Sequence, residues 1–303
     1  MWFKNLQLYR LSRPFELSPQ QLEECLQSCA FTPCASQDLS RFGWAPPLGK
    51  LGVPLVHAAN GEYLLCARKE EKIIPPAVIK EALAEKVEAL EHEQGRALKK
   101  KEKEALKEEL LHTMLPKAFS RHSQTFAWIS PADNLIAVDA SSTNKADDLL
   151  ALLRKSIGSL PAVPLALKNP PEITMTEWLK EDSLPAGFTL EEEAELRSAM
   201  EHGGIIRCKQ QDLVTDEVKN HLANDKLVTK LALCWGERLS FVLGDDLSLK
   251  RLKFSEELRD QNDDITSEDP AARLDADFAL VTGELAQFIP ALMTALGGEE
   301  APL

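Results

Sequence analysis

The feature that most constrains the fold is a regular alternation of apolar and polar side chains in residues 226–254. It falls into three short runs, at 226–235, 238–244 and 249–254, and a period of two is typical of strands with one buried face. We therefore predict a three-stranded antiparallel meander. Its apolar face would cover a core, and its other face would present Lys226, Lys230, Arg238, Arg251 and Lys253 together.

A basic sheet face suits contact with nucleic-acid phosphates without reading of the bases. The net charge of −13 argues against this only if charge is spread evenly. Acidic residues concentrate at 177–201 and 256–277, whereas basic residues cluster at 96–103, 117–121, 154–155 and 250–253. Such segregation permits a basic surface. An ordinary solvated face of an amphipathic sheet explains the same pattern, so both interpretations stay open.

Local signals predict two hairpins and a helix start nearer the N-terminus. Asn60-Gly61 separates two apolar runs, which is typical of a two-residue hairpin. Residues 125–130 and 135–140 form a similar pair around 131–134. A helix is predicted to begin at Ser18, because Ser18 and Gln21 have the spacing of a capping box.

Residues 78–95 and 100–115 predict two consecutive helices. Apolar side chains recur at three- and four-residue spacing in both, and Ala, Glu, Lys and Leu dominate their composition. Such composition favours exposed helices. We predict a protruding helical arm that Pro116 ends.

The remaining patterns complete an α+β chain with mostly antiparallel sheet. Predicted strands lie at 5–11 and 205–209, a Pro- and Gly-rich loop at 31–54, and helices at 145–157, 174–180, 190–202, 215–223 and 275–296. Three regions follow: an N-terminal α+β domain of 1–75 and 120–170, the arm with its tip at 76–119, and a C-terminal α+β domain of 171–303 with the meander and the terminal helix.

The chain is expected to stay in the cytoplasm, away from membranes. No apolar run approaches the roughly 20 residues that span a bilayer, and the first residues lack the features of a signal peptide. The six cysteines form no Cys-x-x-Cys pair and have no histidine cluster near them. Reduced thiols and no metal are therefore expected.

No catalytic signature emerges from the sequence. The segment from Gly43 to Lys50 is similar to a P-loop but has five residues between its glycines, and Leu51 replaces the Mg²⁺-binding hydroxyl. Carboxylates at 260–269 are dense enough to consider for Mg²⁺-dependent nuclease chemistry, but a solvated acidic loop explains them as well. Those carboxylates are Asp260, Asp263, Asp264, Glu268 and Asp269.

Short segments match one known family in order along nearly the whole chain. They are Trp2–Leu6, Ala30–Cys34, Cys66–Ile73, Ala118–Arg121 with Ser123–Thr125, Leu152–Lys155, Val228–Ala232, Ser248–Phe254 with Glu257–Asn262, and Asp275–Asp277 with Thr282–Leu285. Together they resemble the RdgC family of bacterial recombination-associated proteins.

The resemblance implies a non-enzymatic protein without cofactor that binds double- and single-stranded DNA with little sequence preference and restrains the RecA recombinase. In the family, two horseshoe-shaped subunits close into a dimeric ring around DNA, so a nucleoid-associated homodimer is expected. The residues expected to contact DNA are Arg96, Lys99, Lys100, Lys101, Lys103, Lys117, Arg121, Lys226, Lys230, Arg238, Lys250, Arg251 and Lys253.

The resemblance also implies a contact between the arm tips of the two subunits. Phe119 matches a family residue of this contact, and the facing segment matches Lys209, Gln210 and Gln211. Many family members have two consecutive lysines where this chain has Lys209-Gln210, which weakens any charge-based role for Gln210. A local core residue beneath Pro116 is the other interpretation of Phe119.

Two further functions stay open at this stage. One is the Mg²⁺-dependent nuclease that would use the carboxylates at 260–269. The other is a protein–protein adaptor that acts on RecA through its helical arm without DNA.

Overall fold

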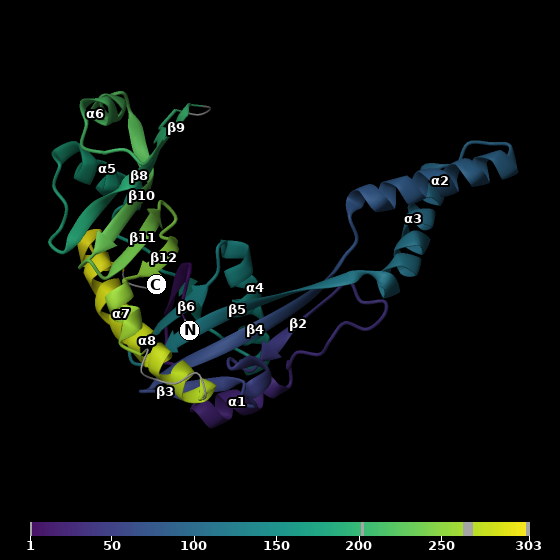
Figure 1. Ribbon diagram of the computed structural model, residues 1–303, viewed down its shortest axis with the longest axis horizontal. Coiled ribbons are helices and arrows are strands. Elements are labelled where there is room, and N and C mark those ends of the chain that lie inside the picture. Colours follow the sequence, from purple (N-terminus) through teal and green to yellow (C-terminus); the bar gives the residue numbers. More distant parts are fainter. Residues whose placement is uncertain (1, 201–202, 263–268, 301–303) are drawn as a thin grey trace. The chain divides into compact units, whose positions relative to one another are not determined.

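A long antiparallel sheet runs through the chain, and some of the helices lie against it (Figure 1). The computed structural model describes residues 2–200, 203–262 and 269–300. They form two compact units: one of 1–26, 46–66 and 125–303, the other of 27–45 and 67–124. This confirms the predicted α+β class, while the predicted division into three regions stays a prediction.

The first unit holds most of the sheet. From β5 (Phe119–Ser130) the strand order runs through β6, β1, β12, β11, β10 and β8 to β9. In addition, β7 pairs with β1, and β3 pairs with β4 (Glu62–Ile73). The strands are β1 (Leu6–Leu11), β3 (Val56–Ala59), β6 (Leu135–Asp139), β7 (Ala162–Pro164), β8 (Phe188–Ser198), β9 (Ile205–Lys209), β10 (Lys226–Trp235), β11 (Leu239–Gly244) and β12 (Leu249–Phe254). The meander of β10, β11 and β12 is confirmed.

Most helices of the first unit lie at or near their predicted positions, but the helix at Glu256–Asp260 was not predicted. They are α1 (Pro19–Gln27), α4 (Thr143–Ile157), α5 (Pro171–Glu181), α6 (Asp216–Ala223), α7 (Glu256–Asp260) and α8 (Pro270–Ala295), with a 3₁₀ turn at Gly49–Leu51. The capping box is present: the Ser18 backbone N–H donates to Gln21 Oε1 at 2.9 Å, and the Gln21 N–H donates to Ser18 Oγ at 3.3 Å. The predicted start of the last helix at 275 was late, because the Asp269 side chain caps it.

The second unit contains the two predicted arm helices. They are α2 (Pro76–Gln94) and α3 (Lys100–Met114), followed by a 3₁₀ turn at Leu115–Lys117. Gly95 ends α2 with a φ of 64°, a left-handed conformation that favours glycine. Strands β4 (Glu62–Ile73) and β5 (Phe119–Ser130) contribute to both units, and β2 (Ser40–Ala45) lies beside β4.

Two predicted assignments are wrong. Residues 188–198 form β8 rather than a helix, although Glu and Leu dominate them, because pairing with β10 and β9 outweighs their intrinsic preference for helix. The predicted loop at 31–54 contains β2, in which Trp44 is buried. Gly43 lies in this strand, where a Cβ atom would come within 2.8 Å of the Cys29 carbonyl oxygen, so close backbone approach explains this glycine without phosphate binding.

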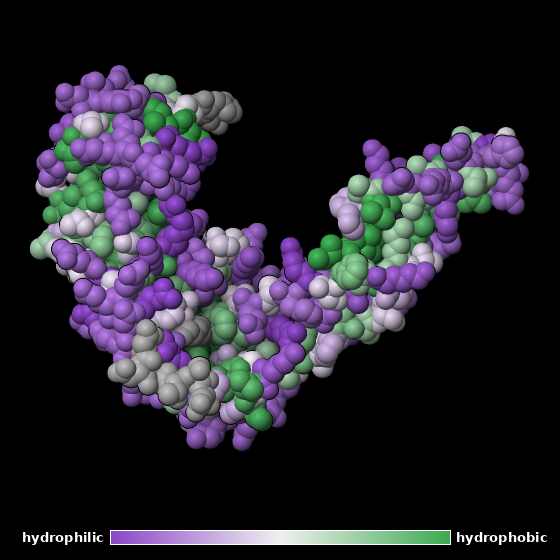
Figure 2. Space-filling model, in the orientation of Figure 1, coloured by the Kyte–Doolittle hydropathy of each residue, from purple (hydrophilic) through white to green (hydrophobic). Residues whose placement is uncertain are grey.

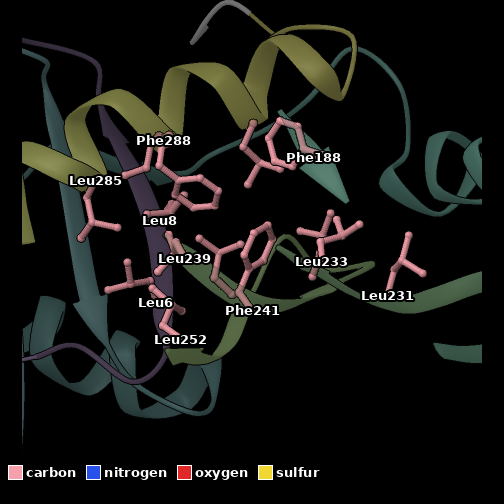
Figure 3. Close-up of a cluster of buried hydrophobic side chains, with 14 of the residues drawn as sticks. Leu6, Leu8, Phe188, Leu231, Leu233, Leu239, Phe241, Leu252, Leu285 and Phe288 are labelled. Carbon is pink, nitrogen blue, oxygen red and sulfur yellow. The ribbon is translucent and has the colours of Figure 1, made fainter. Parts of the chain in front are cut away.

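Helix α8 supplies much of the core on one face of the sheet. Leu285 and Phe288 are buried in one cluster with Leu8, Leu239 and Phe241 (Figure 3). Phe278 belongs to the same buried cluster. The expectation that no segment is long and apolar enough to span a bilayer is wrong for α8, by length and composition alone. Charged residues such as Asp277 and Glu284 interrupt the apolar residues of α8, so the helix contains no long uninterrupted apolar run. Half of its apolar 18-residue stretch is buried inside the protein.

Replacing Phe288 with alanine should lower the free energy of unfolding by about 3–5 kcal/mol, because the cavity lies in a close-packed core. Its ring is fully buried, with centroids 4.9 Å from Phe241 and 5.5 Å from Trp235. Urea unfolding followed by tryptophan fluorescence measures the change. Met200→Ala is the control, because this side chain is 72% exposed. Equal stability of the two variants would contradict the assigned core.

Candidate nucleic-acid interface

The sheet face opposite α8 carries four of the predicted basic residues; we call it the open face. On β8, Ala194 and Leu196 are buried in the core, so Glu193 and Glu195 alternate onto the open face. Register pairs Lys230 with Glu195 and with Gly244, Lys250 with Val242, and Lys253 with Ser240. Arg251 lines a hollow on this face with Lys253 and Ser240.

A backbone irregularity brings Lys250 and Arg251 to the same side. The register shifts between Ser240 and Val242, and Arg251 adopts a φ of 53°. A bulge of this kind inserts one residue and re-aims its side chain. Lys250, Arg251 and Lys253 can therefore share the open face, while Leu249, Leu252 and Phe254 are buried.

The predicted grouping is wrong for Lys226 and Arg238. The register shifts between Val228 and Lys230, so Lys226 shares the core side with buried Val228 while Lys230 does not. Arg238 Nη2 donates to Glu284 Oε1 of α8 at 2.5 Å. Glu284 is buried, so this guanidinium is held by a counter-charge from the core helix.

The sequence did not reveal that carboxylates lie among the basic residues of the open face. Glu195 is almost fully buried and pairs with Arg207 at 2.8 Å, Lys230 at 3.0 Å and Arg197 at 3.8 Å. The Arg207 hydrogen bond, followed by Lys230, lowers the pKa of Glu195 to about 2. Glu193 pairs with Arg251 at 2.8 Å. The incorrect helix prediction at 190–202 concealed this row of side chains.

The segment expected to face Phe119 lies at the rim of the same face. Lys209 pairs in register with Glu193, and Lys209 and Gln210 line the hollow beside Arg251. The hollow measures about 590 Å³. Gln210 has a φ of 52°, and the Gln211 side chain donates to Glu217 at 3.3 Å. The surface near β9 mixes hydrophilic and hydrophobic residues (Figure 2).

The basic residues of the arm divide into paired and exposed groups. Arg96 pairs with Glu102 at 2.6 Å and lowers the pKa of this carboxyl to about 2. Lys103 pairs with Glu91 at 3.2 Å, and the Lys99 backbone N–H donates to Glu102. Lys100 and Lys101 are exposed and form no ion pair with the described part of the chain. The arm thus offers fewer free cations than its composition suggests.

Phe119 is exposed at the start of β5, between two further predicted DNA contacts. Its side chain is 86% exposed, so the interpretation as a core residue beneath Pro116 is wrong. Lys117 is exposed in the preceding turn. Arg121 is also exposed, but it donates to Glu71 Oε2 at 2.8 Å. A large exposed aromatic ring can anchor an interface where a partner supplies a pocket for it.

The described residues contain no group of three or more His, Cys, Asp or Glu side chains that could hold a metal ion. Of the carboxylates considered for a nuclease, Asp260 lies at the end of α7 and Asp269 caps α8, whereas Asp263, Asp264 and Glu268 lie outside the described residues. No disulfide bond joins any of the six cysteines, of which only Cys66 and Cys208 are buried.

Comparison with known proteins gives matches along the whole chain. The family model described as "Putative exonuclease, RdgC" matches residues 1–299. A protein of Aeromonas hydrophila subsp. hydrophila is 80% identical over 300 residues, covering 99% of both chains. Relatives from Tolumonas auensis and Edwardsiella ictaluri are 67% and 60% identical over 301 residues, covering 99% of this chain and at least 99% of their own. All three are named "Recombination-associated protein RdgC".

Matches of this length and identity, on an α+β chain with a charged sheet face, define a protein of the recombination-associated class. The chain belongs to the RdgC family, as the resemblance indicated.

At pH 7, Glu195→Gln should have a lower free energy of unfolding than the unchanged protein. This difference in free energy should shrink in acid. The pKa of Glu195 falls from 4.5 to about 2 on folding, so its carboxylate stabilises the fold fully above pH 4.5. This contribution is lost as pH falls toward about 2. Urea unfolding at pH 7, 4.5 and 3 measures the gap. Glu24→Gln, at an exposed position of α1, is the control; a Glu195→Gln gap that stays constant with pH would contradict the assignment.

Proposed function

We propose that this member of the RdgC family acts in recombination as a sequence-independent DNA-binding protein without catalytic activity. It would encircle or coat DNA as a dimeric ring and restrain RecA. The structural observation that supports the proposal best is a set of lysines that are exposed or half-exposed and form no ion pair within the described residues. They are Lys100, Lys101, Lys117, Lys250 and Lys253.

Such lysines suit the phosphate backbone. Each cation that neutralises a phosphate releases a condensed counterion, which drives binding and makes it dependent on salt. Backbone contacts fix the position of a protein on DNA but carry no base sequence directly. Both single and double strands present this backbone. A DNA-bound protein of this kind would act on the nucleoid in the cytoplasm and would need no cofactor.

The exposed ring of Phe119 supports the dimeric part of the proposal. Aromatic side chains that enter a partner's pocket contribute a large share of interface energy. We place this ring at a contact between two subunits, opposite Lys209, Gln210 and Gln211. Closure at this contact would let a ring hold closed circular DNA more persistently than linear DNA, which has free ends.

Retention on closed circular and linearised duplex of identical sequence, compared in gel-shift format over a salt series, tests the proposal. The unchanged protein should bind both forms with strong salt dependence and persist longer on circles. Phe119→Ser should bind linear DNA equally well but lose the preference for circles, with an unchanged far-UV circular dichroism spectrum. Leu51→Ser, at another exposed apolar position, should keep the preference. Persistence of Phe119→Ser on circles would exclude its role in closure.

Reversing charge at Lys100 and Lys101 to glutamate should weaken binding to all DNA sequences alike. The plot of log affinity against log salt has a negative slope. This slope should become shallower by about 0.9 for each phosphate of duplex DNA that the variant no longer neutralises. The matched control is Lys145→Glu with Lys155→Glu, two exposed positions on α4 that change net charge equally. Equal effects of the two double variants would remove the arm from the DNA-binding surface.

The description of the matching family model keeps a nuclease as the second candidate. DNA that stays intact after long incubation with Mg²⁺ or Mn²⁺ would exclude it. A direct adaptor predicts inhibition of RecA with no retention of DNA, so absence of binding at low salt would favour that function instead.

A further inference from the structure

The open face of the sheet continues beyond the meander onto β8 and β9. Arg207 of β9 lies beside Glu195 of β8, which in turn lies beside Lys230 of β10. One row therefore crosses three strands, with neighbouring strands about 4.8 Å apart. Arg197 lies two residues along β8 from Glu195 and reaches the same carboxylate.

Within this row the negative charge is buried and the positive charges face water. The Glu195 side chain is 7% exposed, whereas Arg207, Arg197 and Lys230 are 63%, 54% and 41% exposed. Thr229 also donates to Glu195, so the carboxylate is well held in place. A ligand in solution would meet the three cations first.

The cations keep donors for a second acceptor. Arg207 donates to Glu195 through Nε, and a guanidinium has five N–H donors in a planar fork. Lys230 uses its ammonium group for Glu195 at 3.0 Å, and an ammonium has three donors. Phosphate oxygens are the acceptors that such forks and ammonium groups bind well.

The row continues along the sheet with the same alternation of charge. Glu193 lies between Lys209 and Arg251, and Glu191 accepts a hydrogen bond from Ser240, whose register partner is Lys253. Arg207 of β9, Lys230 of β10 and Arg251 of β12 each pair with a carboxylate of β8. Phosphate binding here competes with pairs that already exist.

We infer that Arg207 and Arg197 extend the phosphate-binding surface onto β8 and β9, and that the Glu195 carboxylate sets the strength of that surface by partly neutralising it. The inference rests on the proposed function, because DNA is the ligand that carries the phosphates. Removing the Glu195 charge should release Arg207 and Lys230 for phosphate oxygens. Removing Arg197, the most distant of the three partners, should subtract one phosphate interaction and leave the two closer pairs intact.

The experiment measures affinity of the full chain for a short labelled duplex of mixed sequence, between about 50 and 200 mM salt, the range in which phosphate contacts change affinity strongly. Glu195→Gln should bind roughly fivefold tighter at the lowest salt, the factor that corresponds to about 1 kcal/mol for one ion pair at a surface. Its salt slope should be steeper by about 0.9 per additional phosphate neutralised, and Arg197→Gln should show a slope shallower by about 0.9.

Glu24→Gln is the matched control, because it changes net charge by the same amount on an exposed part of α1. If Glu195→Gln and Glu24→Gln have the same affinity and slope, the inference fails while DNA binding stands. If Glu195→Gln does not fold, Arg197→Gln decides, and an unchanged slope in that variant overturns the inference. If the unchanged protein binds no DNA at low salt, the proposed function fails and this inference fails with it.

Discussion

The packing of α8 against the sheet is the interaction on which the rest of the first unit depends. Leu285 and Phe288 join side chains from β1 and β11 in one buried cluster (Figure 3), to which Phe278 also belongs. Burial of a large apolar side chain contributes about 1.5–3 kcal/mol, so this face is strongly fixed. Since the core occupies one side of the meander, the other side is left for charged residues. The open face is thus a consequence of where α8 packs.

Backbone irregularities then decide which charges share that face. Side chains alternate with a period of two, so one inserted residue moves all later side chains to the opposite side. The shift at Thr229 separates Lys226 from Lys230, and the positive φ of Arg251 lets it stand beside Lys250. The pattern of residue types alone, read with perfect alternation, therefore gives a different charged surface.

Features set by residues close together in the sequence were predicted correctly, whereas features set by residues far apart in the sequence were not. The Asn60-Gly61 turn and the Ser18 cap depend on residues within a few positions, and both were predictable. Strand β8 depends on pairing with β10 and β9, which no local signal of a Glu-rich segment shows. Arg238 was misplaced for the same reason, since its partner Glu284 lies 46 residues away. The sequence therefore predicted that Lys230, Arg251 and Lys253 share one sheet face, but it did not show that Glu193 and Glu195 lie there and pair with Arg251 and Lys230.

The same counter-charges bear on how a chain of net charge −13 could contact phosphates, as we propose. Glu195, Glu284 and Glu102 are each paired with a basic side chain, so they contribute little free negative potential where they lie. The same pairs reduce the number of cations that are free to bind. Contact with a phosphate depends on the balance between unpaired cations and unpaired carboxylates close to it. More distant charges matter less, because charges beyond about 8–10 Å are largely screened at physiological salt. A face in which Arg207, Lys230 and Arg251 each pair with a carboxylate of β8 would suit the sequence-independent DNA binding and release that we propose.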